Sequence, residues 1–195
     1  LVLWAGLFPM PTSQELLGAI EKLEVERCAD DIGGFQLTLR VDKSVGGEFD
    51  LLRSPQLVVG ARVVIGVLMG VLPQWLCDGV ITHRELSPSD KPGQSRLLIT
   101  GREVSTLLDQ VDVVQSYPGC PDSVIATTIL ARYAVRGVVP AVSLTTDIPS
   151  PTERIPLQRE TDLKCLQRLA ADNGYVFYVE PLGYGRNLAY FGPDT

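Results

Sequence analysis

Acid–base or nucleophilic catalysis needs a base, and this 195-residue chain has one histidine, His83. A serine or cysteine nucleophile works only with such a base and an acid that orients it. His83 lies in residues 80–86, at the end of an alternating strand pattern, which favours a surface position at the rim of a sheet. We therefore do not expect an enzyme, and a cell-wall hydrolase with His83 as its base stays an alternative.

Carboxylate pairs, metal ligands and phosphate loops are the other sources of chemistry. Glycoside hydrolysis needs two acids at one cleft, whereas the acids here mostly fall at turns and helix starts, where they have local structural roles: Asp30, Asp31, Asp109, Asp112, Asp122 and Asp162. The cysteines form no C-x-x-C, so we expect reduced thiols and no zinc site from Cys28, Cys77, Cys120 and Cys165. No phosphate-binding glycine loop is present, and no cofactor is expected.

Composition indicates a folded protein that does not bind nucleic acid specifically. The hydrophobic fraction is 45%, the charged fraction 21% and the formal net charge −6. No apolar run reaches the roughly 20 residues that span a bilayer. Residues 1–10 are apolar but lack a basic leader, so no signal peptide is expected. Because the first residue is not Met, we expect the chain to be part of a longer one.

Strand patterns dominate the first hundred residues. In residues 35–41 the apolar side chains alternate strictly with polar ones. Gly60 and Gly66 interrupt an apolar run and predict a bulge or bend, as a closed barrel requires. About five strands are predicted, over residues 20–28, 35–41, 57–69, 74–84 and 95–100. Residues 1–100 are therefore predicted to form a small antiparallel β-barrel.

Residues 101–195 are predicted to form a small α+β domain, so the fold class is α+β and mainly β. Its clearest element is a helix that Thr161 caps and Asp162 opens, with Leu163, Leu166, Leu169 and Ala170 on one face. Asn173 and Gly174 end that helix. Other elements are predicted as helices over residues 102–110 and from Asp122 or Ser123 to about Tyr133, one strand within 137–156, a buried strand over 175–179 and a strand over 187–191.

Three stretches, taken in order, carry a family resemblance. The first is Phe35-Gln36-Leu37 after a small-residue loop, and the second is Gly79, Ile81 and Thr82 followed by Gly101 and Glu103. The third combines Gln158, Thr161 and Asp162 with Leu166, Leu169, Ala170 and Gly174. Together they resemble the baseplate hub, or tail-tube initiator, of contractile phage tails and related injection systems. This group includes the late control D proteins and the N-terminal part of type VI secretion spike proteins; Glu103 stands where it usually has Asp.

The resemblance implies a structural protein that acts as a spike adapter. Such a subunit forms a homotrimer, in which two tube-type β-barrels per subunit make a pseudo-sixfold ring. That ring joins a hexameric inner tube to a trimeric spike, beside other baseplate components. The chain would contain the first barrel and the inserted α+β unit, without the second barrel. Assembly is expected in the bacterial cytoplasm, into a phage tail or contractile injection system.

Two further considerations bear on this hypothesis. An acidic chain repels DNA phosphates, as suits the wall of a channel that passes cargo without holding it. A surface carbohydrate- or peptide-binding β-module remains the main alternative. Trp4 and Trp75 are well separated in sequence and are expected in the core or at an interface rather than in a sugar-binding platform.

Overall fold

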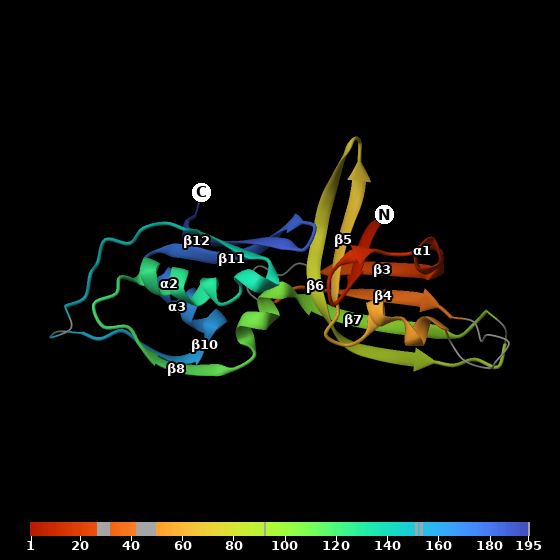
Figure 1. The fold of residues 1–195 in the computed structure, drawn as a ribbon, viewed down its shortest axis with the longest axis horizontal. Coiled ribbons are helices and arrows are strands. Elements are labelled where there is room, and N and C mark those ends of the chain that lie inside the picture. Colours follow the sequence, from red (N-terminus) through yellow and green to blue (C-terminus); the bar gives the residue numbers. More distant parts are fainter. Residues whose placement is uncertain (27–31, 42–49, 92, 151, 153, 195) are drawn as a thin grey trace. The chain divides into compact units, whose positions relative to one another are not determined.

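The computed structural model describes residues 1–26, 32–41, 50–91, 93–150, 152 and 154–194. The chain divides into two compact units, of which the first is Leu1–Val104 with Gly183–Gly185 and the second is Ser105–Leu182 with Arg186–Thr195. Strands predominate over helices, which confirms the α+β, mainly β fold class (Figure 1). The domain bounds expected from the sequence, 1–100 and 101–195, stay a prediction.

The first unit is built on a curled antiparallel sheet of seven strands in the order β2-β1-β5-β6-β7-β4-β3. A short helix, α1, precedes β3, and Ser13 caps it by accepting a hydrogen bond from the Leu16 amide. The elements of this unit are β1 (Val2–Gly6), β2 (Met10–Pro11), α1 (Gln14–Ala19), β3 (Ile20–Glu26), β4 (Gly34–Arg40), η1 (Asp50–Arg53), η2 (Pro55–Leu57), β5 (Arg62–Met69), β6 (Leu72–Ser87) and β7 (Arg96–Glu103).

The core of the first unit follows the predicted alternation. Phe35, Leu37, Leu39 and Val41 are all buried, as one face of a strand should be. Side chains from β1, β5, β6 and β7 join them, among them Leu3, Val63, Ile65, Cys77, Ile81, Leu97 and Ile99. Burial of this face holds the register of β4 against its neighbours, because a slip of one residue would turn the whole set towards solvent.

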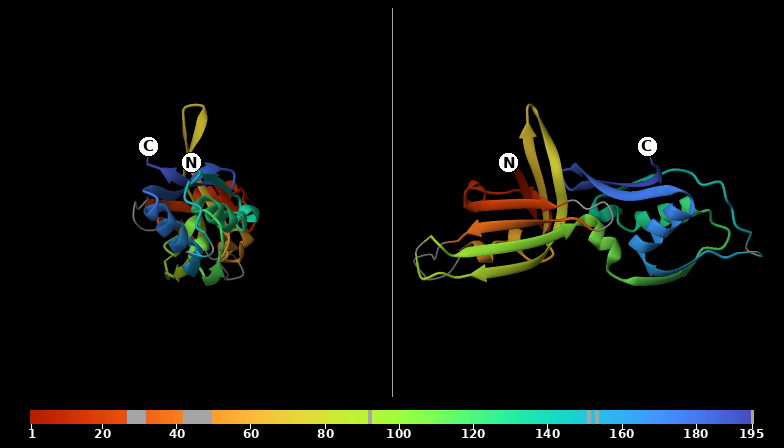
Figure 2. Two further views of the ribbon diagram at one scale, coloured as in Figure 1. Left: turned by 90° about the vertical axis from the view of Figure 1, so that its left-hand side faces the viewer. Right: turned by 180° about the vertical axis from the view of Figure 1, so that it is seen from behind.

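Strands β5 and β6 continue beyond the sheet as a two-stranded ribbon (Figures 1 and 2). The register shifts between Ile65 and Gly66, which confirms the bend predicted at Gly66. A Cβ atom on Gly66 would lie 2.9 Å from the ring of Trp75, so only glycine lets this indole pack against the ribbon. The pairing of β1 with β5 also ends at Gly66.

The second unit combines two helices, a three-stranded sheet and a two-stranded ribbon. The sheet has the order β11-β12-β9, with β12 parallel to β9, and the ribbon pairs β8 with β10. Both helices contact the sheet. Its elements are η3 (Val104–Asp109), β8 (Asp112–Ser116), α2 (Asp122–Ala131), η4 (Ala134–Arg136), β9 (Val138–Val142), β10 (Leu157–Thr161), α3 (Asp162–Asp172), β11 (Tyr175–Gly183) and β12 (Arg186–Pro193).

Helix α3 forms as the sequence predicts. The Thr161 hydroxyl accepts a hydrogen bond from the Lys164 amide at 3.3 Å, and Gly174 ends the helix with a φ of 66°. The predicted apolar face is buried, and the polar side chains of the opposite face, Lys164, Gln167, Arg168 and Asp172, are exposed. Burial of this stripe against the sheet fixes where the N-terminus of α3 lies.

Three sequence predictions need correction. Residues 175–179 form part of an edge strand, β11, and are half-buried or exposed rather than buried, because β12 lies on only one side of them. The N-cap of α2 is Pro121, with Asp122 in the first turn. Arg102 and Glu103 belong to β7, and a 3-10 helix begins only at Val104.

Several smaller observations complete the comparison. The ribbon strands β8 and β10 were not predicted. Cys120 and Cys165 are free thiols and Cys77 is buried in the core, whereas Cys28, Asp30 and Asp31 lie outside the described residues. Among the helices that the structure describes, none is long and apolar enough to cross a membrane.

Candidate functional site

In the first unit, the predicted family residues meet at the ring of Phe35. Phe35 pairs with Gly101 across β4 and β7, and Ile81 pairs with Gly101 from β6. A Cβ atom on Gly101 would lie 2.2 Å from Cζ of Phe35, and one on Gly79 would lie 3.0 Å from its Cε1. The ring therefore lies across two strands where they have no side chain, an arrangement in which an aromatic covers glycines of a sheet. We call Phe35, Gly79 and Gly101 the glycine cradle.

The other predicted residues of this unit flank the cradle. Leu37 and Ile81 are in the core, and Gln36 is half-buried opposite Thr100. Thr82 is exposed at a register shift of β6 and donates a hydrogen bond to the Thr100 carbonyl at 3.2 Å. Glu103 ends β7, where its amide donates to the Gly33 carbonyl at 2.9 Å. These residues hold three strands together and do not form a cluster of exposed polar side chains.

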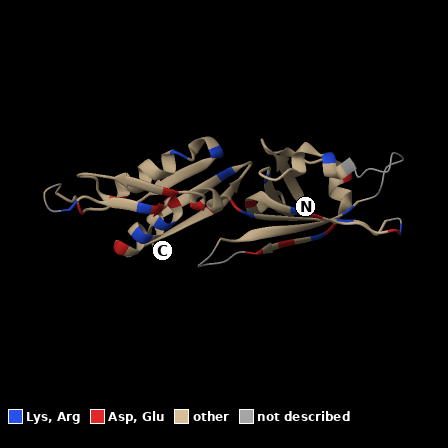
Figure 3. Cartoon of the chain, turned by 90° about the horizontal axis from the view of Figure 1, so that it is seen from below, with Lys and Arg blue, Asp and Glu red and all other residues tan. Residues whose placement is uncertain are grey.

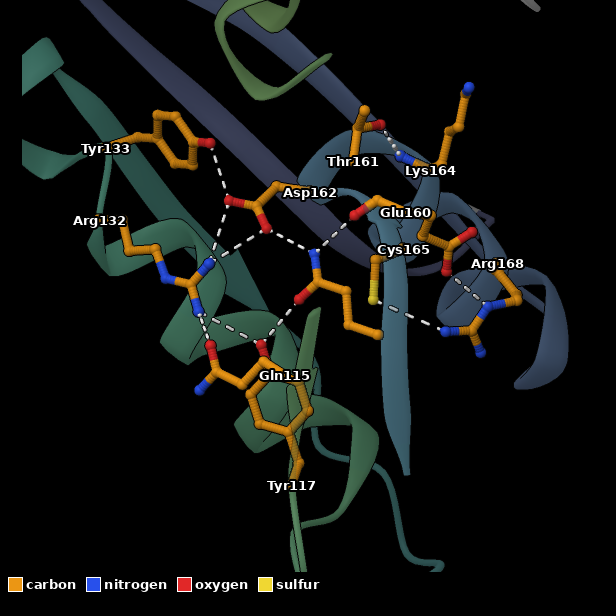
Figure 4. A network of polar contacts seen from close by, with 11 residues as sticks. Gln115, Tyr117, Arg132, Tyr133, Glu160, Thr161, Asp162, Lys164, Cys165 and Arg168 are labelled. Atoms are coloured by element: carbon orange, nitrogen blue, oxygen red, sulfur yellow. Dashed lines mark hydrogen bonds and ion pairs between the residues drawn. The ribbon is translucent and has the colours of Figure 1, made fainter. Parts of the chain in front are cut away.

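In the second unit, three predicted residues meet at the start of α3, where Asp162 is the centre (Figure 4). The Asp162 side chain is only 3% exposed. It accepts hydrogen bonds from Gln158 Nε2 at 2.6 Å, from the Tyr133 hydroxyl at 2.8 Å and from Arg132 Nη1 at 3.2 Å. The guanidinium supplies the opposite charge that a buried carboxylate requires. We call Asp162, Gln158, Arg132, Tyr133 and Tyr117 the Asp162 network.

The network continues through Gln158, which is fully buried in β10. Its Oε1 accepts a hydrogen bond from the Tyr117 hydroxyl at 2.8 Å, and Arg132 Nη2 donates to both Tyr117 and Gln115. The five members therefore connect α3, the ribbon strand β10, the segment after β8 and the end of α2. Each buried polar atom of Asp162 and Gln158 has a partner, which is the condition under which such a network stabilises a fold.

Two further contacts fix the same region. The Thr161 hydroxyl, besides capping α3, donates to Asp109 at 2.6 Å. Asn173, at the other end of α3, donates to Asp122 at 2.7 Å and so joins the end of α3 to the start of α2. Asp109 and Asp122 therefore bind partners that are far away in sequence, whereas the sequence predicted only local structural roles for them. Leu166, Leu169 and Ala170 lie in the apolar core between these contacts, and Gly174 ends the helix.

Burial shifts the ionisation of three groups near the network. Burial and the hydrogen bond to Asp162 raise the pKa of Tyr133, and burial raises the pKa of Tyr117 despite the nearby Arg132. Burial raises the pKa of the Cys165 thiol to about 11. All three groups stay protonated near neutral pH, so both tyrosines can donate hydrogen bonds and the thiol is not a nucleophile.

This geometry favours a structural role over catalysis. A general base needs a free lone pair within reach of a substrate, but three donors surround the buried Asp162. His83 is exposed on β6, at the surface position that the sequence predicted. Among the residues that the structure describes, no three His, Cys, Asp or Glu side chains gather to hold a metal ion. Acidic and basic residues are interspersed in both units (Figure 3), a pattern that does not favour a polyanion.

Sequence reasoning found Gln158, Thr161 and Asp162 but missed what surrounds them. Asp162 was predicted as a helix-opening charge, whereas it is the buried centre of a network. Arg132 lies 30 positions away along the chain, and nothing in its local pattern marks it as a partner. The usable signal was the Arg132-Tyr133 pair directly after an apolar helix face, because a cation there must find an anion or water.

The chain shares its fold with tail proteins. A tail protein from Neisseria meningitidis matches 96% of the chain with a TM-score of 0.59 and 15% sequence identity. A 43 kDa prophage tail protein from Shewanella oneidensis matches 96% with a TM-score of 0.58 and 16% identity. A component of the E. coli type VI secretion system, described as structurally similar to the phage T4 tail proteins gp27 and gp5, matches 88% with a TM-score of 0.57 and 16% identity.

The chain spans about half the length of these neighbours, 49%, 51% and 49% of them respectively. No protein-family model matches the chain, and no curated protein matches its sequence. Structural similarity at these identities shows a common fold.

Proposed function

We propose that this chain is a structural subunit of a baseplate hub, and that it joins the hexameric inner tube to the trimeric spike of a phage tail or contractile injection system. The observation that supports this most strongly is the fold shared with tail proteins over 96% of the chain. The type VI secretion neighbour supports an injection-system setting, because it is itself described as similar to phage tail proteins.

The two groups in which the family residues gather fit a structural role. The side chains at the centres of the glycine cradle and the Asp162 network, Phe35 and Asp162, are buried, and both groups connect elements of their unit. In this proposal residues 1–100 are the tube-like β-barrel domain and residues 101–195 the inserted α+β domain. The subunit is a homotrimer, its partners are the inner tube protein, the spike and other baseplate components, and it assembles in the bacterial cytoplasm without enzymatic activity.

Deletion of the coding sequence tests this role in a cell that produces the particles. Loss of a tube initiator should leave free tube protein and few assembled tubes, and the full-length chain supplied in trans should restore them. Normal particle numbers and lengths after deletion would contradict the proposal. If the wild-type chain hydrolyses peptidoglycan and His83→Ala abolishes that activity, the hydrolase alternative is favoured instead.

A binding module is the second candidate, and one observation favours it. A cavity of about 650 Å³ lies along β3, β4 and β7, with Glu24, Glu26, Gln36 and Arg102 among its lining residues. This volume falls in the range of small-molecule sites. Saturable binding of a glycan or peptide, lost on Arg102→Ala, would favour the module, whereas no binding on a glycan or peptide array would favour the hub.

A further inference from the structure

The end of the β5–β6 ribbon is an exposed apolar segment of the first unit. Leu68, Met69 and Val71 are 59%, 66% and 94% exposed, and we call residues 68–71 the hairpin tip. The ribbon stands away from the sheet in both views of Figure 2. A solvated apolar tip of this kind is unfavourable in a free monomer and typical of a surface that a partner covers.

The ribbon is anchored firmly at its base. Arg62 donates two hydrogen bonds to Asp78, at 2.6 and 2.9 Å, and the Asp78 side chain is fully buried. A bidentate pair of this geometry joins β5 and β6 within the sheet, at the end of β5 that still pairs with β1. Among the described strands, β1 pairs with β5 only as far as Gly66, and β7 pairs with β6 only from Gly79 onward. The hairpin tip therefore projects from a well-anchored ribbon, and neither β1 nor β7 pairs with it.

A second exposed apolar segment lies at the opposite end of β5. The turn between β1 and β2 exposes Leu7 by 69%, Phe8 by 86% and Met10 by 62%, and we call residues 7–10 the apolar turn. Gly6, directly before it, pairs with Arg62, whereas the tip lies beyond Gly66. The eight residues of β5 separate the apolar turn from the hairpin tip, a distance of about 26 Å along the strand. One copy of the unit therefore cannot cover its own tip with its own turn.

Charge points to a second copy of the chain as the occupant. With a net charge of −6, identical copies repel one another over most of their surface. Residues 1–13 and 63–77 contain no Asp, Glu, Lys or Arg, and these two stretches carry the apolar turn and the hairpin tip. Contact between them buries apolar surface without bringing like charges together.

We infer that the hairpin tip of one copy docks on the apolar turn of a second copy, so that copies associate head to tail. A contact between two different patches propagates from copy to copy and closes into a ring when the rotation allows it. The inference rests on the proposed function in one respect, because it names the surface through which copies of a hub would meet.

Two single variants of the full chain test this contact. Val71→Glu places a charge in the tip and Phe8→Glu places one in the turn; both sites are solvent-exposed, so both variants should fold. We expect sedimentation velocity to show concentration-dependent association of the wild type, weakened at least about tenfold in each variant. Val135→Glu, at a side chain that is 92% exposed in the second unit, is the matched control and should associate as the wild type does.

Mixing the two variants separates a head-to-tail contact from a symmetric one. The Phe8→Glu chain keeps an unaltered hairpin tip and the Val71→Glu chain keeps an unaltered apolar turn. The mixture should therefore form dimers that grow no further. A monomeric wild type, a mixture without dimers, or association that survives either variant would overturn the inference. Binding of a monomeric wild type to phosphatidylcholine vesicles, lost on Val71→Glu, would assign the tip to a lipid surface instead.

The two proposals fail in distinguishable ways. Trapped dimers from a chain that is absent from tail particles would refute the hub and leave the head-to-tail contact standing. If the chain is incorporated into tail particles but its mixed variants form no dimers, the hub stands and the head-to-tail contact is refuted.

Discussion

The glycine cradle and the Asp162 network solve the same problem with opposite chemistry. Each joins three or more elements of its unit through residues that are distant in sequence. The cradle does so by shape, since the Phe35 ring occupies the space that side chains on Gly79 and Gly101 would need. The network does so by charge and hydrogen bonding around a buried carboxylate. A shape-based contact should be insensitive to pH, whereas a hydrogen-bonded one should not.

The largest effect is expected in the cradle. Phe35→Ala removes a buried ring and leaves the backbone of two strands uncovered, so the free energy of unfolding should fall by about 4 kcal/mol. Urea denaturation followed by fluorescence and circular dichroism measures it. Leu1→Ala, at an exposed apolar side chain of the same unit, is the control and should change little. A loss under about 1 kcal/mol for Phe35→Ala would mean that the ring is not central to this unit.

Removal of the central carboxylate should have the next largest effect. Asp162→Ala leaves Gln158 and Tyr133 without their acceptor and Arg132 without its counter-ion, and should cost about 3 kcal/mol. The Arg132 side chain is 34% exposed and regains some hydration in the variant. The loss of unfolding free energy is therefore expected at the lower end of the roughly 3–5 kcal/mol that breaking a buried ion pair costs. Asp147→Asn breaks an exposed pair with Arg154 and should cost under about 1 kcal/mol. Equal losses for the two variants would refute the network's structural importance.

A smaller loss of stability is expected when Gly101 of the cradle gains a side chain, and a double-mutant cycle tests whether crowding against Phe35 causes it. Gly101→Ala forces a methyl group into the Phe35 ring and should cost about 2 kcal/mol. Combination with Phe35→Leu should cost less than the sum of the two single changes, because the smaller side chain makes room. Strict additivity in this double-mutant cycle would show that the ring and the glycine do not interact.

The smallest effect concerns pH. The pKa of Cys165 is about 11 in the folded protein, raised from an ordinary value of 9.0, so the folded state holds its proton more tightly than the unfolded state. Stability from this group is complete below pH 9 and is lost as pH rises towards 11. Cys165→Ala should therefore flatten the fall in unfolding free energy over that interval, as measured by urea denaturation at several pH values. An unchanged pH profile would contradict the assignment.

The sequence predicted well where local chemistry decides structure. Helix α3 has its own cap, apolar stripe and terminating glycine, and β4 has strict alternation, so both were found with their faces correct. Ribbon strands β8 and β10 were missed because their short segments lack a clear apolar period and depend on each other for pairing. The edge strand β11 was predicted as buried because aromatic and β-branched residues also favour half-covered strands.

The polar partners of the candidate site were beyond local patterns. Asp162 is recognisable as a helix-opening acid, but its burial depends on Arg132 and Tyr133, which tertiary packing brings from the end of α2. The glycine cradle was anticipated only as separate residues of three stretches. Its meaning, one ring over two glycines, depends on the register of β4, β6 and β7.

The central claim is that this chain is a hub subunit at the junction of tube and spike. Electron microscopy of particles that carry an epitope-tagged copy, labelled with gold-conjugated antibody, tests it most directly. The account predicts label at one end of the inner tube, at the spike. Label along the length of the tube, or particles without label, would contradict it.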